Sequence, residues 1–247
     1  MSRRSLLITG AAGLIGGLLV NHFRDKYELR LLDRTAIAGE DTIVADISDL
    51  DAISDVFSGI DTVVHLAADP GLETPWEMLL PDNIIGTYHV FKAARRASVN
   101  KIIYASSNHV TGMYERVDPP LYRRERPPQI DHTVPIRPDS LYGVSKCFGE
   151  ALGRFYAEEY GISVICLRIG SVLRDNDPSR DERFRSTWLS HRDLAQLVER
   201  CVEVEGLIFE IFYGVSNNTR QFWDISHVRE ILGYNPQDNA DSVLAGV

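Results

Sequence analysis

Ser5-Leu-Leu-Ile-Thr9 runs directly into Gly10-Ala-Ala-Gly13-Leu-Ile-Gly16, and this stretch decides the fold. The first segment predicts a short buried strand, and the apolar run after the glycines predicts a helix. Gly10 permits the tight turn, Gly13 lets a ligand approach the backbone, and Gly16 lets the helix pack on the strand. Backbone N–H groups and the helix dipole at such a turn favour an anion such as a pyrophosphate.

The next predicted strand, Leu29-Arg-Leu-Leu-Asp33, ends in an acid 17 residues beyond Gly16. A carboxylate at this distance accepts hydrogen bonds from an adenosine ribose, so the turn and Asp33 together predict a dinucleotide site. The same carboxylate repels a 2′-phosphate, which predicts NAD as the cofactor rather than NADP. Arg34 stands beside the acid and would offset part of that repulsion. An aspartate that only starts a turn is the alternative interpretation of Asp33.

Short apolar strands alternate with helices through residue 169. Further strands are expected at Thr42–Asp46, Asp61–Ala68, Lys101–Ser107 and Ile162–Ile169, and helices at Leu50–Phe57, Pro81–Ala97 and Tyr142–Tyr160. This alternation is typical of a parallel sheet covered on both faces, an α/β doubly wound fold of the Rossmann type. Ligands of such sheets bind at the carboxyl ends of the strands.

A dinucleotide would lie across those strand ends, with its adenine near Asp46-Ile47 and its middle passing the small residues after the fourth strand. We expect it to contact the following residues: Gly10, Gly13, Leu14, Ile15, Gly16, Asp33, Arg34, Asp46, Ile47, Leu66, Ala67, Ala68, Asn83, Tyr142, Lys146 and Ile169.

Tyr142 stands four residues before Lys146, so both side chains share one face of a predicted helix. A cation beside a phenol favours the phenolate and lowers its pKa, which makes Tyr142 a usable base near neutral pH. Tyr88 and Lys92 have the same spacing, but their helix precedes the fifth strand, so Tyr88 is expected to pack on the sheet with a solvated lysine one turn on. Ser107 ends that strand at the cleft that the next helix enters. The expected catalytic residues are Ser107, Tyr142 and Lys146.

The segment from Tyr114 to Asp139 is polar, contains six prolines and lacks periodicity, which predicts a long surface loop. A substrate lid is one interpretation of this loop. After Gly170 the pattern is irregular, with a helix starting in Trp188–Leu194, a strand at Phe209–Tyr213 and a helix at His227–Leu232. We therefore divide the chain into an NAD-binding core that carries the catalytic residues, 1–168, and a smaller substrate-binding portion interleaved with it, 169–247.

The net charge of −9 argues against a general nucleic-acid surface and against an anionic membrane as partner. Cys147, Cys166 and Cys201 are too few for a disulfide framework, so free thiols in a reducing cytosol are expected. No segment is typical of a signal peptide or a membrane span, and we expect a cytoplasmic protein. None of the 7 histidines has metal-ligand spacing, so no metal is expected.

These motifs resemble those of the extended short-chain dehydrogenase/reductase superfamily, the NAD-dependent epimerases and dehydratases. Within it, four segments are similar to those of bacterial uronate dehydrogenases: Ser106–Tyr114, Leu141–Glu150, Arg168–Ser171 and Ser186–Ser190. Those enzymes oxidise C1 of a hexuronic acid to an aldarolactone with NAD. The resemblance implies the same cofactor and reaction here, and a homo-oligomeric assembly.

The resemblance also assigns roles to individual residues. Tyr142, as phenolate, would take the C1 hydroxyl proton while hydride leaves C1 for the nicotinamide. Lys146 would lower the tyrosine pKa and hold the nicotinamide ribose, and Ser107 would hydrogen-bond the reacting oxygen. The substrate-binding residues that it implies are Ser107, Asn108 and His109 for the sugar, and Ser171 and Arg183 for its carboxylate.

One segment departs from the uronate enzymes, which carry a small Gly/Ser segment where this chain has Ala67-Ala-Asp-Pro-Gly71. That segment and the arginine-containing loop look more like haloarchaeal NAD-dependent glucose-6-phosphate dehydrogenases. A hexose 6-phosphate held by Arg183 and by Arg123–Arg126 is therefore the leading alternative substrate. A nucleotide-sugar epimerase or dehydratase is a further alternative, although its substrate domain is longer than this chain provides. A non-catalytic NAD sensor would have no need of the Ser107, Tyr142 and Lys146 set.

Overall fold

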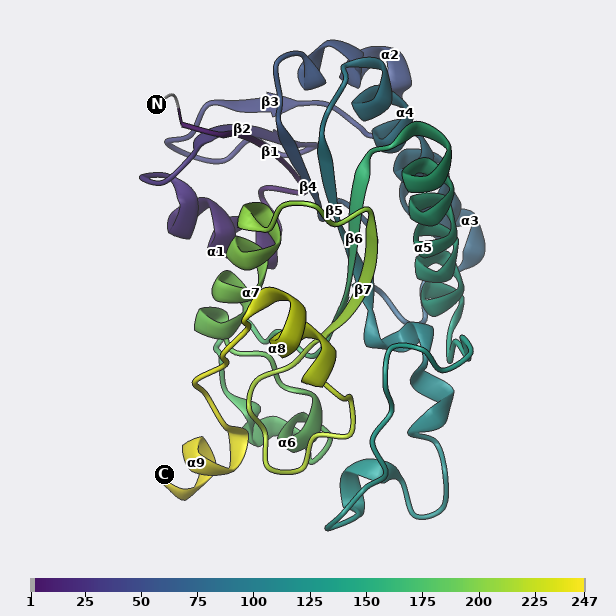
Figure 1. Cartoon of the computed structure of the whole chain (residues 1–247), viewed down its shortest axis with the longest axis vertical. Coiled ribbons are helices and arrows are strands. Elements are labelled where there is room, and N and C mark those ends of the chain that lie inside the picture. The colour runs from purple at the N-terminus through teal and green to yellow at the C-terminus, as the bar shows by residue number, and fades with distance from the viewer. Residues whose placement is uncertain (1–2, 247) are drawn as a thin grey trace.

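The computed structural model describes residues 3–246, which contain a seven-stranded sheet in the order β3-β2-β1-β4-β5-β6-β7 (Figure 1). The strands are β1 (Ser5–Thr9), β2 (Glu28–Asp33), β3 (Thr42–Val44), β4 (Thr62–His65), β5 (Lys101–Ser107), β6 (Ser163–Ile169) and β7 (Phe209–Gly214). Every neighbouring pair is parallel. The strand order reverses between β1 and β4, the point at which such sheets bind ligands.

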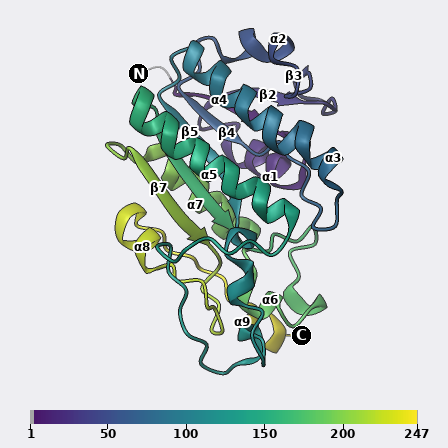
Figure 2. The ribbon, with the colours of Figure 1, turned by 90° about the vertical axis from the view of Figure 1, so that its right-hand side faces the viewer.

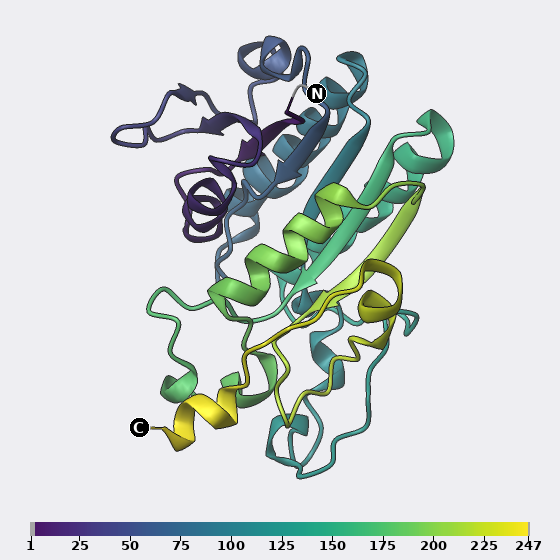
Figure 3. The same ribbon diagram turned by 60° about the vertical axis from the view of Figure 1, so that its left-hand side comes forward.

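Helices cover both faces of the sheet, as the alternating pattern predicts. The helices are α1 (Leu14–Phe23), α2 (Leu50–Ile53), α3 (Trp76–Leu79), α4 (Thr87–Arg96), α5 (Leu141–Tyr160), α6 (Phe184–Thr187), α7 (His191–Glu203), α8 (Ser226–Leu232) and α9 (Ala240–Ala245). Helices α4 and α5 lie on the face turned to the viewer in Figure 2, and α1 and α7 lie on the opposite face, where α7 runs along the sheet in Figure 3. The Rossmann-type fold is confirmed.

The core follows from the sequence pattern. Every residue of β5 is buried, as a central strand covered on both faces requires. In α7 the apolar residues Leu194, Leu197, Val198 and Cys201 recur at helical spacing, and all four are buried against the sheet. The three cysteines are free thiols. Within residues 3–246, no helix combines the length and the apolar character that a membrane crossing requires.

The helix predicted from Pro81 to Ala97 begins earlier and is not regular. It starts at Trp76, directly after Pro75, and a π-helical segment, η2 (Leu80–Gly86), joins α3 to α4. Proline has no N–H for the helical ladder, and a π-turn at Pro81 accommodates that loss within a continuous helix. The prediction correctly placed a helix here but took this proline as its first residue.

The carboxyl-terminal part differs from the prediction in two places. The helix expected to start at Trp188 begins at His191, because Trp188 is extended and pairs with Ser171 in an isolated bridge. Ser190 caps α7 by accepting a hydrogen bond from the Asp193 N–H at 3.1 Å. Helix α9 is absent from the prediction. The long loop after β5 contains short 3-10 turns and an isolated bridge from Ile130 to Trp223. It lies with α6 and α9 beyond the strand ends, whereas α8 packs beside β7 (Figure 1).

Candidate active site

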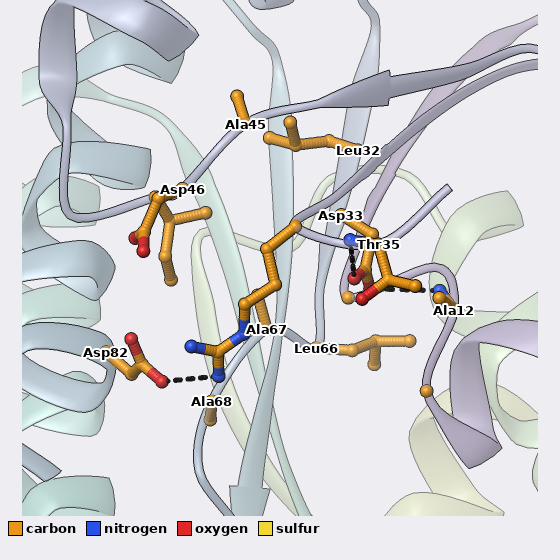
Figure 4. A pocket seen from close by; sticks show the side chains of 14 residues that line it. Ala12, Leu32, Asp33, Thr35, Ala45, Asp46, Leu66, Ala67, Ala68 and Asp82 are labelled. Atoms are coloured by element: carbon orange, nitrogen blue, oxygen red, sulfur yellow. Dashed lines mark hydrogen bonds and ion pairs between the residues drawn. The ribbon is translucent and has the colours of Figure 1, made fainter. Parts of the chain in front are cut away.

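A cavity of about 330 Å³ opens beside the glycine turn that joins β1 to α1 (Figure 4). Gly10 has a positive φ of 72°, and a side-chain carbon there would lie 2.7 Å from the Ala67 nitrogen. At Gly16 such a carbon would lie 2.2 Å from the Gly10 carbonyl oxygen, so only glycine lets α1 lie this close to the turn. The turn thus presents bare backbone at the amino end of a helix, where anions bind.

Many of the residues expected at the cofactor line this cavity: Gly10, Gly13, Asp33, Arg34, Asp46, Ile47, Leu66, Ala67 and Ala68. Five lining residues are additional to the sequence prediction: Ala12, Leu32, Thr35, Ala45 and Asp82. Each of these flanks a predicted position in the chain. Asp82, the neighbour of Asn83, enters the cavity from the π-helical segment η2, whose geometry the sequence pattern does not reveal.

The remaining residues expected at the cofactor lie outside the cavity walls: Leu14, Ile15, Gly16, Asn83, Tyr142, Lys146 and Ile169. Asn83 is buried and its amide is paired within the protein. Its Oδ1 accepts from the Asp69 N–H at 2.8 Å, and its Nδ2 donates to Asp69 O and Ser145 Oγ, both at 3.0 Å. Asn83 therefore connects η2 to the segment after β4 and to α5.

Asp33, at the end of β2, is held by two backbone donors. Its Oδ2 accepts from the Ala12 N–H at 3.0 Å and its Oδ1 from the Thr35 N–H at 2.9 Å. Each carboxylate oxygen can accept a further hydrogen bond, so the acid can still bind a ribose diol. The turn presents bare backbone, the Asp33 carboxylate is held in one orientation, and the nearby Ala67 is small. Together these features fit a dinucleotide.

Ser107, Tyr142 and Lys146 come together at the carboxyl end of β5. The first turn of α5 carries Tyr142, and the Ser140 side chain caps that turn. Lys146 Nζ is buried, lies 5.5 Å from the centre of the Tyr142 ring and donates to Ala105 O at 2.8 Å. The arrangement brings a phenol, a hydroxyl and an amine together, which suits proton transfer to or from a ligand oxygen.

The pKa of Tyr142 differs from the sequence expectation. Burial raises it to about 12, a hydrogen bond from Ser107 opposes that rise, and the nearby Asp69 carboxylate adds to it. The expected lowering by Lys146 is not found, because burial lowers the pKa of Lys146 itself to about 7 and so weakens its charge near neutral pH. Asp69, in the segment that departs from the uronate enzymes, therefore acts on the candidate base.

Tyr88, which shares the spacing of the Tyr142 motif, lies on α4 and is 40% exposed. The Lys92 ammonium lies 5.4 Å from the centre of its ring. Helix α4 covers a face of the sheet. The prediction that Tyr88 packs on the sheet is wrong, because its side chain is exposed. The two motifs are nevertheless separate, since Tyr142 and Lys146 lie on α5 and Tyr142 is hydrogen-bonded to Ser107.

His109 and Asn108 follow Ser107 in a short 3-10 turn. The His109 ring lies 6.1 Å from the Tyr142 ring, centre to centre, and its Nδ1 lies 2.9 Å from both carboxylate oxygens of Asp139. This contact orients the imidazole beside the candidate base. Asn108 is buried, and among the described residues its Nδ2 has no hydrogen-bond partner. A donor of this kind beside the cleft suits a ligand oxygen.

Arg183 and Ser171 lie together, as the resemblance implies. Arg183 Nη1 is 3.3 Å from Ser171 Oγ and 3.5 Å from Thr187 Oγ1. Arg183 Nε donates to Glu115 Oε1 at 2.8 Å, and Glu115 is buried. Arg183 Nη2 and Glu115 Oε2 are buried with no partner among residues 3–246. The guanidinium thus keeps one unpaired donor, but an internal carboxylate balances its charge.

A buried ion pair lies beneath this cleft. Arg168 Nε and Nη2 each lie 2.9 Å from a carboxylate oxygen of Glu150, and Ser106 Oγ donates to the same carboxylate at 2.6 Å. Arg168 Nη1 also donates to the Tyr213 hydroxyl at 3.2 Å. The network joins β5, β6, β7 and α5. Within residues 3–246, no group of three or more His, Cys, Asp or Glu side chains could hold a metal ion.

The sequence argument missed several residues of this site, namely Asp69, Glu115, Asp139 and Thr187. Glu115 and Asp139 lie at the two ends of the long loop, whose irregular pattern carries no periodic signal. A carboxylate near a cluster of arginines is a weak signal for a partner of Arg183. Only the fold shows which acid meets which base.

Known proteins resemble this chain over nearly its whole length. A sequence profile of the NAD dependent epimerase/dehydratase family matches residues 6–232. The NAD-dependent glucose-6-phosphate dehydrogenase of Haloferax volcanii is 42% identical over 246 residues, covering 95% of this chain and 94% of that protein. The uronate dehydrogenase of Pseudomonas putida is 38% identical over 248 residues, covering 98% of this chain and 87% of that protein.

A solved structure also resembles this chain over its whole length. A uronate dehydrogenase from Agrobacterium tumefaciens superposes with a TM-score of 0.87 at 35% identity, covering 100% of this chain and 89% of that chain. The sheet, the helices on both faces and the segments beyond the strand ends therefore have counterparts in a known enzyme fold.

Proposed function

The chain belongs to the NAD-dependent epimerase/dehydratase family, and on that premise we propose that it oxidises a cyclic sugar at C1 to a lactone, with NAD as the cofactor. The observation that carries the proposal is the convergence of Ser107, Tyr142 and Lys146 at the end of β5, beside the glycine-turn cavity. This set can move a proton at the hydroxyl of a bound sugar.

NAD supplies the hydride acceptor for C1 when it is bound. In the proposed site, the backbone of the glycine turn faces the pyrophosphate and Asp33 accepts from the adenosine ribose. Tyr142 takes the proton of the C1 hydroxyl, and Ser107 donates a hydrogen bond to that oxygen. Lys146 lies beside the tyrosine ring, where its amine can hold a ribose hydroxyl. The protein thereby supplies alignment and proton transfer.

The substrate in this proposal is a hexuronate. Its planar carboxylate suits a guanidinium and a hydroxyl side by side, which Arg183 and Ser171 provide 3.3 Å apart. The unpaired Nη2 of Arg183 is the donor available to it, and Asn108 Nδ2 is a second unpaired donor for the sugar. Residues 169–247 are then the substrate-binding portion, although they also contribute β7 to the sheet.

A hexose 6-phosphate is the second candidate, and two observations favour it. The glucose-6-phosphate dehydrogenase of Haloferax volcanii has the higher identity of the two relatives compared above. Arg123, in the long loop, lies 3.0 Å from Glu182, the neighbour of Arg183, so a second cation is close to the proposed subsite. A phosphate carries more charge than a carboxylate and would require that second cation.

The test measures NADH formation with glucuronate, galacturonate, glucose 6-phosphate and neutral glucose in parallel. The proposal predicts turnover of a hexuronate and a raised KM in Arg183→Ala. Arg180→Ala is the matched control, because Arg180 is an exposed arginine of the same segment, paired with Asp175. Turnover of glucose 6-phosphate alone would reject the hexuronate, and turnover of none of the sugars would reject a dehydrogenase of these sugars.

We further propose a cytoplasmic homo-oligomer. The three free thiols suit a reducing compartment, where NAD is also available. The outer faces of the α3–α4 segment and α5 expose large apolar side chains, among them Met78, Tyr88, Val144 and Phe155. Exposed apolar groups on neighbouring helices favour burial against a second copy. Light scattering after size-exclusion chromatography tests this: a dimer or larger species is expected, and a monomer at micromolar concentration would contradict it.

A further inference from the structure

An ion pair spans the cavity beside the glycine turn. Arg34 follows β2 on one side, and Asp82 lies in η2 on the other. Arg34 Nη2 and Asp82 Oδ2 are 2.7 Å apart, and both residues line the cavity. The dashed line that ends at Asp82 in Figure 4 marks this contact.

Asp82 is the fixed member of the pair. Its side chain is 14% exposed, whereas that of Arg34 is 62% exposed. The neighbouring Asn83 holds η2 in place through hydrogen bonds to Asp69 and Ser145. The position of Asp82 is therefore set by the π-turn, and the flexible arginine side chain extends across the cavity to meet it.

The charge around Arg34 is dominated by acids. Asp33, Asp46 and Asp82 line the same cavity. Asp82 makes the largest contribution to the raised pKa of Arg34, and Asp46 and Asp33 add to it. Three carboxylates face one guanidinium, so the adenosine end of the site remains net negative even with the arginine present.

In folds of this type, an arginine near the ribose-binding acid, as Arg34 is near Asp33, can accommodate the 2′-phosphate of NADP. In this protein the Arg34 guanidinium is paired with Asp82 instead. We propose that Asp82 is a cofactor-specificity residue, which holds the Arg34 guanidinium across the cavity and withholds it from a 2′-phosphate. Asp82 and Asp33 then select NAD together, Asp33 by its contact with the ribose and Asp82 by retaining the cation. The inference rests on the proposed dinucleotide site.

Direct binding tests this without any sugar. NADH and NADPH fluorescence titrations give a Kd for each dinucleotide with the wild-type protein and with Asp82→Asn. The asparagine keeps the size and removes the charge, so it releases Arg34. We expect NADPH to bind about tenfold more tightly to the variant, the scale of one charge-assisted hydrogen bond, while NADH binding changes less than about twofold.

Three variants make the result decisive. Glu77→Gln removes one exposed carboxylate from α3 and is the control for net charge; it should leave both Kd values unchanged. Asp82→Glu keeps the carboxylate and should keep the preference for NADH. In the double variant Arg34→Ala, Asp82→Asn the gain in NADPH affinity should disappear, because Arg34 is the group that supplies it.

The outcomes distinguish failure of this inference from failure of the proposed function. Unchanged NADPH affinity in a folded Asp82→Asn protein overturns the inference. A gain that survives in the double variant also overturns it, since simple loss of repulsion would then explain the effect. If the wild-type protein binds neither dinucleotide, the proposed function itself is rejected, and this inference with it.

Discussion

Tyr142 is the residue on which the proposed chemistry depends. Replacement by phenylalanine removes the group that takes the C1 proton and leaves the ring packing. We expect Tyr142→Phe to lower kcat by about 10²–10⁴-fold, the usual cost of losing a positioned acid or base, with NADH binding nearly unchanged. Tyr88→Phe is the matched control, because Tyr88 has the same lysine spacing but lies on α4. An inactive Tyr88→Phe with an active Tyr142→Phe would contradict the site.

Asp69 tunes the same phenol through its charge. The carboxylate disfavours the phenolate and so raises the pKa of Tyr142. In Asp69→Asn this repulsion is gone, while the amide oxygen can still accept from Gly71 and Thr74. The pKa of Tyr142 then falls, and the alkaline rise of kcat/KM should move to lower pH.

The measurement is the pH profile of NADH formation for the wild-type protein and for Asp69→Asn. Glu73→Gln removes an exposed carboxylate from the same segment and serves as the control. If the profile of Asp69→Asn coincides with that of the wild type, or moves to higher pH, Asp69 does not act on Tyr142.

Glu115 balances the charge of Arg183, and this pairing sets how strongly the site attracts an anion. Glu115→Gln keeps an oxygen near Arg183 Nε but removes the competing charge. We expect the KM for a hexuronate to fall about three- to tenfold. The kcat should change little, because the carboxylate of the substrate is remote from C1. Glu125→Gln, an exposed acid of the same loop, is the control. An unchanged or higher KM in Glu115→Gln would show that Arg183 does not hold the anion.

At the scale of the elements, the Glu150–Arg168 pair joins α5 to β6 beneath the site. Both side chains are buried, so Glu150→Ala leaves an uncompensated guanidinium in the core. We expect a loss of about 3–5 kcal/mol in the free energy of unfolding. The exposed Arg154–Glu158 pair on the same helix is the control, and Glu158→Ala should cost about 0.5 kcal/mol or less. Denaturant titrations decide this, and equal losses in the two variants would contradict it.

The elements themselves were predictable where the pattern is regular. Strands β1, β5 and β6 are apolar runs bounded by polar residues, and α5 has clear helical spacing with a glycine, Gly161, just beyond its end. The π-turn at η2 was not predictable, because its register depends on how Pro81 fits between α3 and α4. Asp82 reaches the cofactor cavity only through that turn, so its role was hidden in the sequence.

At the scale of the whole molecule, the sheet topology predicts which residues come together in most of the site. The alternation of strands and helices predicts which ends lie together, and this placed Ser107 beside Tyr142. The partners that come from irregular segments could not be placed in this way. Asp139 and Glu115 lie 24 residues apart in a loop without periodicity, and their contacts with His109 and Arg183 depend on the folded chain.

The central claim is that hydride leaves C1 of a bound sugar for NAD. Glucuronate deuterated at C1 tests it most directly, with the mass of the reduced cofactor as the readout. We expect the wild-type protein to form NADH carrying one deuterium and Tyr142→Phe to form almost none. Unlabelled NADH would show that hydride comes from another carbon, and no NADH with any labelled sugar of the panel would contradict C1 oxidation altogether.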